Sequence, residues 1–487
     1  MKHLGMLLFV LMPGLARAER PLTYDEVVRL AAERSPGVRQ AAAVAEQAEA
    51  DVRAARGFFD PAFTLGGGWD RGLSRQRFGQ FPEPFNLTSD AWNLDLGLQA
   101  SAPTGTSASF DASVRASTVV VDASGAGGIV GDLFGNGQTQ RNYQPSFRLT
   151  LSQELLRGIR LAFNLRNVRR AASSLTAAEL EQERASQQAI ADAAKAYWSW
   201  FHLAKVAQNS SRSVVVAEEN LRVGTAKVAA GQAAPLEATR LEAALVQART
   251  TALEAENSAA QAADALLLLL GEAPGQSLSP ASELGDAPAV QLDPTTAVED
   301  ALAGSPEILV ARERLRQARL GLADSRHAMW PSLTASVTGG LQGFDDTSLG
   351  AAFTLNETMF PSIGIAGTLR VPLGNRAAAG AAQRAAAEVQ LLQDALAALE
   401  GQTRAAVEQQ VRLLASAARR VELTDTNVRL ARETLAAEEA LHAVGRTLLK
   451  DVLEARTQVE RAEAEAIRAR TDFRAAEVEL RRLQGRL

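Results

Sequence analysis

Two acidic residues near the C-terminus are the side chains whose type and spacing suggest chemistry. Asp451 and Glu454 lie three residues apart, shortly after Gly445. In an α-helix this spacing places both carboxylates on one face, and the helix dipole favours acids in a first turn. The pair can therefore be ordinary helix-starting acids, or a negatively charged surface that attracts cations. The residues alone leave both interpretations open.

Patterns of catalytic or metal-binding residues do not occur in this sequence. The four histidines lie far apart, and there is no zinc-ligand spacing, phosphate-binding loop or nucleophile elbow. The absence of cysteine excludes disulfides, thiolate metal sites, a cysteine nucleophile and a lipid-bearing N-terminal cysteine. We therefore expect no enzymatic activity, no cofactor and no metal site.

The first 18 residues have the pattern of a secretory signal peptide. Lys2 precedes an apolar run over residues 4–15, and residues 16–18 (Ala-Arg-Ala) match a cleavage site. A buried N-terminal helix is the alternative interpretation. Cleavage would remove Lys2 and Arg17, which changes the net charge from −5 to about −7.

The remaining composition limits the partners of the chain. An acidic exported protein is a poor candidate for binding nucleic acid. After the signal peptide no stretch approaches 18 apolar residues, so contact with a membrane would use β-strands or a surface rather than a spanning helix. The abundance of alanine and the low aromatic content of 5% favour long helices packed through shallow seams.

The elements that would position the acidic pair belong to a pattern that is duplicated in the chain. A Ser-Pro pair and a later proline recur with an offset of 270 residues. They are Ser35-Pro36 and Pro61 in the first half, and Ser305-Pro306 and Pro331 in the second. We predict a first structural repeat over 19–270, a linker over 271–294 and a second repeat over 295–487.

Each half contains segments in which apolar and polar residues alternate. The first half has four such segments within 61–153, and the second half has two within 331–372. They lie near 61–70, 91–101, 106–118 and 143–153, and near 331–341 and 361–372. Alternation with one apolar face suits a barrel wall between lipid and water. A soluble sandwich with one wet face is the alternative.

A very long helix follows the strands in each half. Residues 162–230 and 376–444 lack proline, and each span would form a helix of roughly 100 Å. Both carry an apolar residue every seven positions, which indicates coiled-coil packing. We predict that each long helix ends at a glycine, Gly231 or Gly445, and that a second helix returns after it. Pro235 would lie in the first turn of the returning helix that follows Gly231.

The duplicated order and the opening LTYDEVVRLAAERSPGVRQAAA resemble the outer membrane efflux protein (TolC) family over nearly the whole mature chain. The resemblance implies a mainly α fold with β-strands. A long coiled α-helical barrel would be continuous with a transmembrane β-barrel shared between the protomers of a trimer. Such a protein resides in the Gram-negative cell outer membrane, among its lipid, and extends into the periplasm. It is not lipid-anchored here, because the chain has no cysteine.

The same resemblance implies a function and its partners. The homotrimer would be a passive exit duct for efflux or type I secretion. It would receive substrates from a periplasmic adaptor and from an inner-membrane RND-type pump or ABC transporter. A non-channel exported coiled-coil protein, such as a periplasmic adaptor or a structural protein, is the alternative. Neither the cargo nor the role of the additional strand hairpin near 91–118 can be predicted.

The resemblance also assigns roles to residues at the two helical turns. Asp451, Glu454 and Glu237 would form an acidic ring at the pore entrance, with two acids per chain making six carboxylates after the second turn. The entrance-closing contacts would involve His442, Arg446 and Thr447, although threonine stands where the family can place arginine. The adaptor would dock on the hairpin tips, represented by Gly231, Pro235, Gly445 and Leu448.

Overall fold

The computed structural model describes most of the chain. The described residues are 20–76, 85–122, 138–232, 234–282, 284–285, 293–354, 358–444 and 446–487. The predicted signal peptide, residues 1–18, and Gly445 lie outside these ranges, as does part of the predicted linker. The domain boundaries expected there therefore stay predictions.

The chain forms two units, and each unit combines segments from both halves of the sequence. The first, which we call the helical unit, contains residues up to Glu46, Thr176–Glu313 and Gln393–Leu487. The second, which we call the sheet unit, contains Gln47–Leu175 and Arg314–Leu392. The two longest helices, α5 (Arg166–Ala229) and α9 (Arg376–Ala443), contribute residues to both units.

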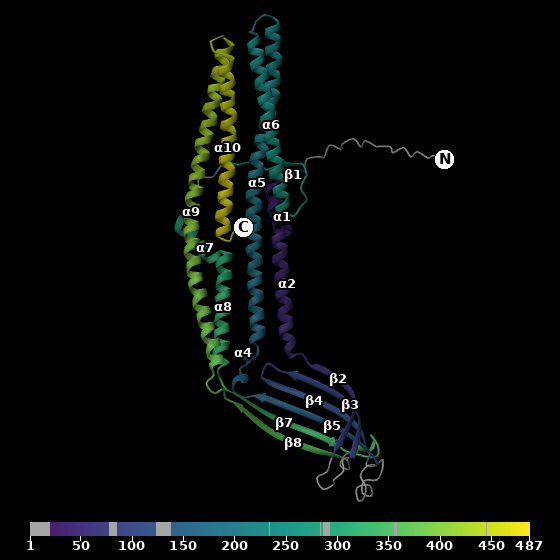
Figure 1. Ribbon diagram of the computed structural model, residues 1–487. Helices are drawn as coiled ribbons and strands as arrows, with labels where there is room; N and C mark the ends of the chain where they lie inside the picture. Colours follow the sequence, from purple (N-terminus) through teal and green to yellow (C-terminus); the bar gives the residue numbers. More distant parts are fainter. Residues whose placement is uncertain are drawn as a thin grey trace, which may run out of the picture. The chain divides into compact units, whose positions relative to one another are not determined.

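The elements follow a similar order in the two halves (Figure 1). The first half contains β1 (Arg20–Leu22), α1 (Tyr24–Arg34), α2 (Pro36–Arg56), the 3-10 turn η1 (Gly57–Phe59), β2 (Ala62–Gln76), β3 (Phe85–Ser101), β4 (Thr106–Asp122), β5 (Gln138–Glu154), η2 (Arg157–Ile159), α4 (Leu161–Asn164), α5 and α6 (Pro235–Leu269). The second half contains β6 (Leu278–Pro280), α7 (Pro294–Gly304), α8 (Pro306–His327), β7 (Ser332–Gly343), η3 (Ala351–Phe353), β8 (Met359–Arg370), α9 and α10 (Leu449–Leu483). The expected fold class, long helices combined with a sheet, is confirmed.

The repeated Ser-Pro pairs break a helix at the same place in each half. Ser35 lies between α1 and α2 with φ −54° and ψ 134°. Ser305 lies between α7 and α8 with φ −61° and ψ 121°. A residue that precedes proline is pushed out of the helical region by the proline ring. The duplicated sequence signal therefore has a direct backbone cause.

Two similar apolar cores hold the helical unit together. In the first half, the end of β1 and the buried face of α1 pack on Tyr197, Trp200 and Phe201 of α5 and on the end of α6. The Tyr197 hydroxyl donates a hydrogen bond to the Leu22 carbonyl at 3.2 Å. In the second half, α7 packs in the same way on α9 and α10, around Phe473. The duplication is therefore visible in the packing.

The predicted seven-residue seam is present on α9 and is matched on α10. Val407, Leu414 and Val421 are buried, whereas Val428 and Leu435 are half-buried. The buried residues of α10 recur at spacings of three and four, and are Val452, Ala455, Val459, Ala462, Ala466, Ala469 and Phe473. Small alanines in this pattern allow the facing helix to approach closely.

The sheet unit contains one antiparallel sheet of six strands in the order β2-β3-β4-β5-β7-β8. All six predicted strands are present. Each strand covers most of its predicted segment, and several are longer than predicted. The additional hairpin near 91–118 is part of this sheet, because β3 and β4 lie between β2 and β5. Its turn requires a glycine, since Gly105 has φ +81°.

The strand register builds one continuous apolar face. Two neighbouring cross-strand rows on this face are Phe63–Leu98–Phe110–Leu149–Gly339–Ile363 and Leu65–Leu96–Ala112–Phe147–Leu341–Pro361. The row between them, on the opposite face, is Thr64–Gly97–Asp111–Arg148–Gly340–Ser362. Phe63 is 62% exposed, Leu65 is 65% exposed and Ile363 is 82% exposed. The sheet therefore presents a wide apolar face that is largely exposed, although Phe353 of η3 packs on Phe147 of this face, with ring centroids 6.1 Å apart.

Within the described part of the chain, no helix combines the length and the apolar character needed to cross a membrane.

Candidate functional site at the hairpin tips

The first helical hairpin turns at Gly231, as the sequence predicts. Gly231 has φ +75°, a conformation that favours glycine. Its N–H donates to the Val228 carbonyl at 2.9 Å, and the Gln232 N–H donates to the Lys227 carbonyl at 2.8 Å. These two bonds form a Schellman motif, which ends a helix. Pro235 then occupies the first turn of α6.

The second hairpin turns next to Gly445, which lies outside the described residues. The Arg446 N–H donates to the Leu441 carbonyl at 2.9 Å, which is the long bond of the same motif. His442 is half-buried, and its Nδ1 atom lies 3.1 Å from the Thr447 carbonyl oxygen. His442 and Thr447 therefore stabilise the turn within one chain, and Arg446 is exposed.

The three predicted acids differ in their surroundings. Asp451 lies in the first turn of α10, and its Oδ2 atom accepts a hydrogen bond from the Leu448 N–H at 3.1 Å. This contact caps the helix, which is the ordinary role of such an acid. Glu454 is exposed and pairs with no described residue, and Glu237 is half-buried in the first turn of α6. Of the three acids, only Asp451 has a side-chain partner among the described residues.

The described residues show no ion pair or hydrogen bond between the predicted site residues of one tip and those of the other. Each tip does expose apolar side chains. Leu236 is 60% exposed, Val444 is 68% exposed and Leu448 is 69% exposed. Of these, only Leu448 was predicted as a docking residue. Leu236 could have been found because it is the first large apolar residue after Gly231 and follows Pro235 directly.

Ion pairs between the two helices of a hairpin explain where the seam of α9 is interrupted. Asp425 and Arg432 stand at positions that an ideal coiled coil would fill with apolar residues. Asp425 accepts two hydrogen bonds from Arg470 of α10, at 3.0 and 3.1 Å. Arg432 donates two to Glu463 of α10, at 2.5 and 3.1 Å. The interrupting residues are therefore paired across the hairpin.

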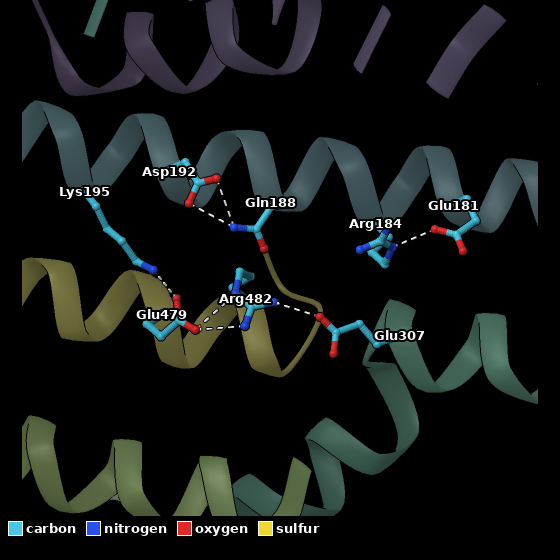
Figure 2. A network of polar contacts seen from close by, with 8 residues as sticks. All are labelled: Glu181, Arg184, Gln188, Asp192, Lys195, Glu307, Glu479 and Arg482. Carbon is cyan, nitrogen blue, oxygen red and sulfur yellow. Dashed lines mark hydrogen bonds and ion pairs between the residues drawn. The ribbon is translucent and has the colours of Figure 1, made fainter. Parts of the chain in front are cut away.

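A polar network joins the first-half helix α5 to the second half (Figure 2). Glu479 of α10 accepts hydrogen bonds from Lys195 of α5 and from Arg482, whose Nη2 and Nε atoms lie 2.8 and 3.1 Å away. Arg482 also donates to Glu307 of α8 at 3.2 Å. Nearer the tips, Ser213 of α5 donates to Glu460 of α10 at 2.5 Å. These contacts fix the second hairpin beside the first.

The network shifts the ionisation of its members. Burial alone would raise the pKa of Glu479, but hydrogen bonds from Arg482 and Lys195 outweigh that effect, so the pKa lies below its ordinary value. For Arg482, burial opposes the charge, whereas the contacts with Glu479 and Glu307 raise the pKa above its ordinary value. Both groups therefore remain charged in the folded protein at neutral pH.

Comparison with solved structures identifies the class of protein that has this fold. The outer membrane protein VceC from Vibrio cholerae is 17% identical, with a TM-score of 0.64 over 95% of this chain and 96% of that chain. The Campylobacter jejuni CmeC outer membrane channel is 16% identical, with a TM-score of 0.63 over 95% and 85%. The Neisseria gonorrhoeae MtrE outer membrane channel is 18% identical, with a TM-score of 0.63 over 95% and 88%. At these identities the likeness establishes the fold.

The sequence itself defines the family. Residues 27–272 and 297–486 match the outer membrane efflux protein family, and the chain belongs to it. The protein is therefore an outer-membrane efflux channel of a Gram-negative cell that extends into the periplasm, and it is not an enzyme. A comparison with curated proteins found no match.

Proposed function

We propose that three copies of the chain assemble into a passive exit duct across the outer membrane. The observation that carries this proposal is the sheet, with its largely exposed apolar face and its two unpaired edges, β2 and β8. Unpaired strand edges seek a partner strand, and a single six-stranded sheet is too small to enclose a lumen. Joining β8 of one copy to β2 of the next would satisfy both edges and turn the apolar face towards lipid.

The helical hairpins would form the periplasmic part of the duct. In this arrangement Glu454 and Glu237 line the entrance with Asp451, and the ring of carboxylates favours cations. Glu454 has no described partner and is free to act on passing ions, whereas Asp451 also caps α10. The exposed Leu236, Leu448 and Val444 give the tips an apolar surface that suits docking of a periplasmic adaptor.

The energy for transport would come from the partner proteins. The motifs of the chain include no nucleotide-binding loop, so an inner-membrane pump of the RND or ABC type would supply the work through the adaptor. The entrance would close through contacts among His442, Arg446 and Thr447 of neighbouring copies. Within one chain these residues stabilise their own turn.

Assembly through the sheet edges can be tested directly because the chain has no cysteine. We would introduce Thr64→Cys in β2 and Thr368→Cys in β8, each third from the end of its strand nearest the helices. A bis-maleimide should then join neighbouring copies and produce species of two and three chains, with none larger. The control pair, Thr150→Cys with Thr338→Cys, lies on adjacent strands with hydroxyls 3.3 Å apart and should crosslink only within a chain. Recovery of the mature protein as a soluble periplasmic monomer would instead support the non-channel alternative.

The acidic entrance requires a separate measurement. The reversal potential of the purified protein in a planar bilayer under a KCl gradient reports its cation preference. Glu454→Gln with Glu237→Gln should lower that preference by roughly threefold, because it removes two negative charges per chain whose attraction for cations is partly screened by salt. Glu254 is an exposed acid further along α6, so the control variant Glu254→Gln should leave the cation preference unchanged. Equal selectivity in all variants would show that these acids are only helix-starting residues.

The docking surface is tested with photo-crosslinking residues. A photo-reactive residue in place of Leu236 or Leu448 should capture an adaptor in cells. The same substitution at Leu253, an exposed leucine on α6 away from the tip, should not. Capture only at Leu253 would place the adaptor elsewhere.

A further inference from the structure

A large cavity in the sheet unit is lined by arginines from three helices. It has a volume of about 1090 Å³ and lies where the first turns of α5 and α9 flank the middle helix α8 (Figure 1). Arg170 of α5, Arg314 of α8, and Arg376 and Arg384 of α9 line it. The acidic entrance proposed above belongs to the helical unit and has no part in this cavity.

The positive charge of the cavity is only partly balanced. Glu388 is the sole carboxylate among the described residues that line it. Arg376 and Arg384 form no ion pair with a described carboxylate. Arg170 is held in place by Asp324, whose Oδ2 atom lies 3.3 Å away and whose side chain is 6% exposed. The sequence nearby has the same bias, because residues 155–170 contain five arginines and no acid.

A second cavity continues the basic lining. It has a volume of about 340 Å³, shares Arg170 and Ser325 with the larger one, and adds Arg157, Arg166 and the carboxylate of Asp324. Guanidinium groups bind phosphate, sulfonate and carboxylate through paired N–H donors. The two neighbouring cavities therefore offer several guanidinium groups to an anionic group.

Between the arginines the lining is small and apolar. It includes Ala318, Gly321, Ala377, Gly380, Ala381 and Leu392. A Cβ atom built on Gly321 or Gly380 would meet no heavy atom within 4 Å, so the space above these glycines is open. The volume is at the upper end of the range for sites that bind drug-sized molecules. An inorganic anion would leave most of it unfilled.

We propose that this cavity binds an anionic amphiphile, a molecule with a sulfonate, phosphate or carboxylate group and an apolar ring or chain. The anionic group pairs with Arg376 and Arg384, and the apolar body lies over the alanines and glycines between them. In a working duct this would be a contact point for anionic cargo. Binding itself does not require conduction, so it can be measured whether or not the duct proposal holds.

Isothermal titration of the purified full chain in a neutral detergent tests the proposal. The probe is naphthalene-1-sulfonate, compared with naphthalene-1-methanol and with inorganic sulfate. Loss of two charged hydrogen-bond donors in Arg376→Gln with Arg384→Gln should weaken probe binding by about tenfold or more. The control, Arg404→Gln with Arg412→Gln, has the same eight-residue spacing on α9 and should bind as the wild type does. The neutral analogue and sulfate should each bind much more weakly than the probe.

A second pair of variants keeps the arginines of the cavity and changes only the size of the side chain at a glycine. Gly380→Leu would fill the cavity, and it adds a better helix former at a position with room for it. It should abolish binding of the sulfonate probe, whereas Gly401→Leu, an equally open glycine on α9 outside the cavity, should not. Unchanged binding in both the arginine and the Gly380 variants would overturn the proposal. Equal binding of the neutral analogue would also overturn it, and tighter binding of sulfate would show a site for inorganic anions instead.

Discussion

Replacing Glu479 by glutamine should weaken the junction between the two halves of the helical unit. In the folded protein Glu479 accepts three charge-assisted hydrogen bonds, one from Lys195 and two from Arg482. The variant would leave Arg482, whose side chain is only 17% exposed, without its principal counter-charge. Its remaining partner would be Glu307, with a side chain 38% exposed.

The expected cost follows from these exposures. The two hydrogen bonds from Arg482 to Glu479 Oε1 are well shielded, and hydrogen bonds to charged groups contribute about 1.5–3 kcal/mol. Lys195 is 37% exposed, so its pair with Glu479 is screened by water and contributes at most about 1 kcal/mol. Glu479→Gln should therefore lower the free energy of unfolding by about 2–4 kcal/mol at pH 7.

The pH dependence of this loss has a definite sign. The folded-state pKa of Glu479 lies below its ordinary value of 4.5. Its stabilisation is therefore fully present above pH 4.5 and is lost as the pH falls through the folded-state pKa. The difference in free energy of unfolding between wild type and variant should be constant from pH 8 to 5, and should decrease towards zero in more acidic buffer.

Thermal unfolding of the purified protein in detergent, followed by circular dichroism across this pH range, would measure the gap. The control is Glu219→Gln. Glu219 also pairs with an arginine, at 2.6 Å, but both side chains are more than half exposed, so the variant should unfold as the wild type does. Equal stability of Glu479→Gln and wild type at pH 7 would refute the role assigned to the network. A gap that widens in acid would refute the assigned pKa direction.

Three further predictions concern the hairpins. Gly224→Ala should destabilise the protein by about 1 kcal/mol, because the new Cβ would lie 2.2 Å from Leu241 Cδ1, whereas Gly401→Ala meets nothing within 4 Å and should stabilise by up to about 1 kcal/mol in the same melts. Burial lowers the pKa of His202 below 6.5, so its protonation favours unfolding; His202→Gln should reduce the stability lost between pH 7 and 5, and an unchanged loss would contradict this. Asp451→Ala removes the acceptor of the Leu448 N–H and should speed hydrogen exchange of that amide by about fivefold, with no change expected if the carboxylate does not cap α10.

The repetitive part of the fold could be predicted from the sequence because its physical causes are local. The Ser-Pro pairs break helices through the proline ring, and Gly231 ends α5 through its positive φ. Alternating residues marked all six strands, because neighbouring cross-strand rows of apolar and polar residues lie on opposite faces of the sheet. Each of these signals acts within a few residues and needs no knowledge of distant contacts.

Contacts between distant segments could not be predicted in this way. Nothing in the sequence near Asp425 indicates that Arg470 stands opposite, since the pairing depends on the register of two helices after a turn. The position of the additional hairpin inside the sheet depends on strand order. The arginine-lined cavity draws on segments more than 200 residues apart.

At the tips the sequence predicted where the chain turns but not what each side chain does there. Asp451 and Glu454 look equivalent in the sequence, three residues apart on one face. In the structure Asp451 caps α10 and Glu454 is unpartnered. His442 contacts the backbone carbonyl of Thr447, a contact that depends on how the turn folds back.

The central claim is that the assembled protein is an open-ended duct, and planar-bilayer recording of the purified, detergent-extracted protein tests it most directly. The account predicts discrete conductance steps that require no nucleotide, with a reversal potential under a KCl gradient that shows preference for potassium over chloride. A protein that inserts as the crosslinked trimer but produces no conductance steps even when His442, Arg446 and Thr447 are replaced, or that produces steps that prefer chloride, would contradict it.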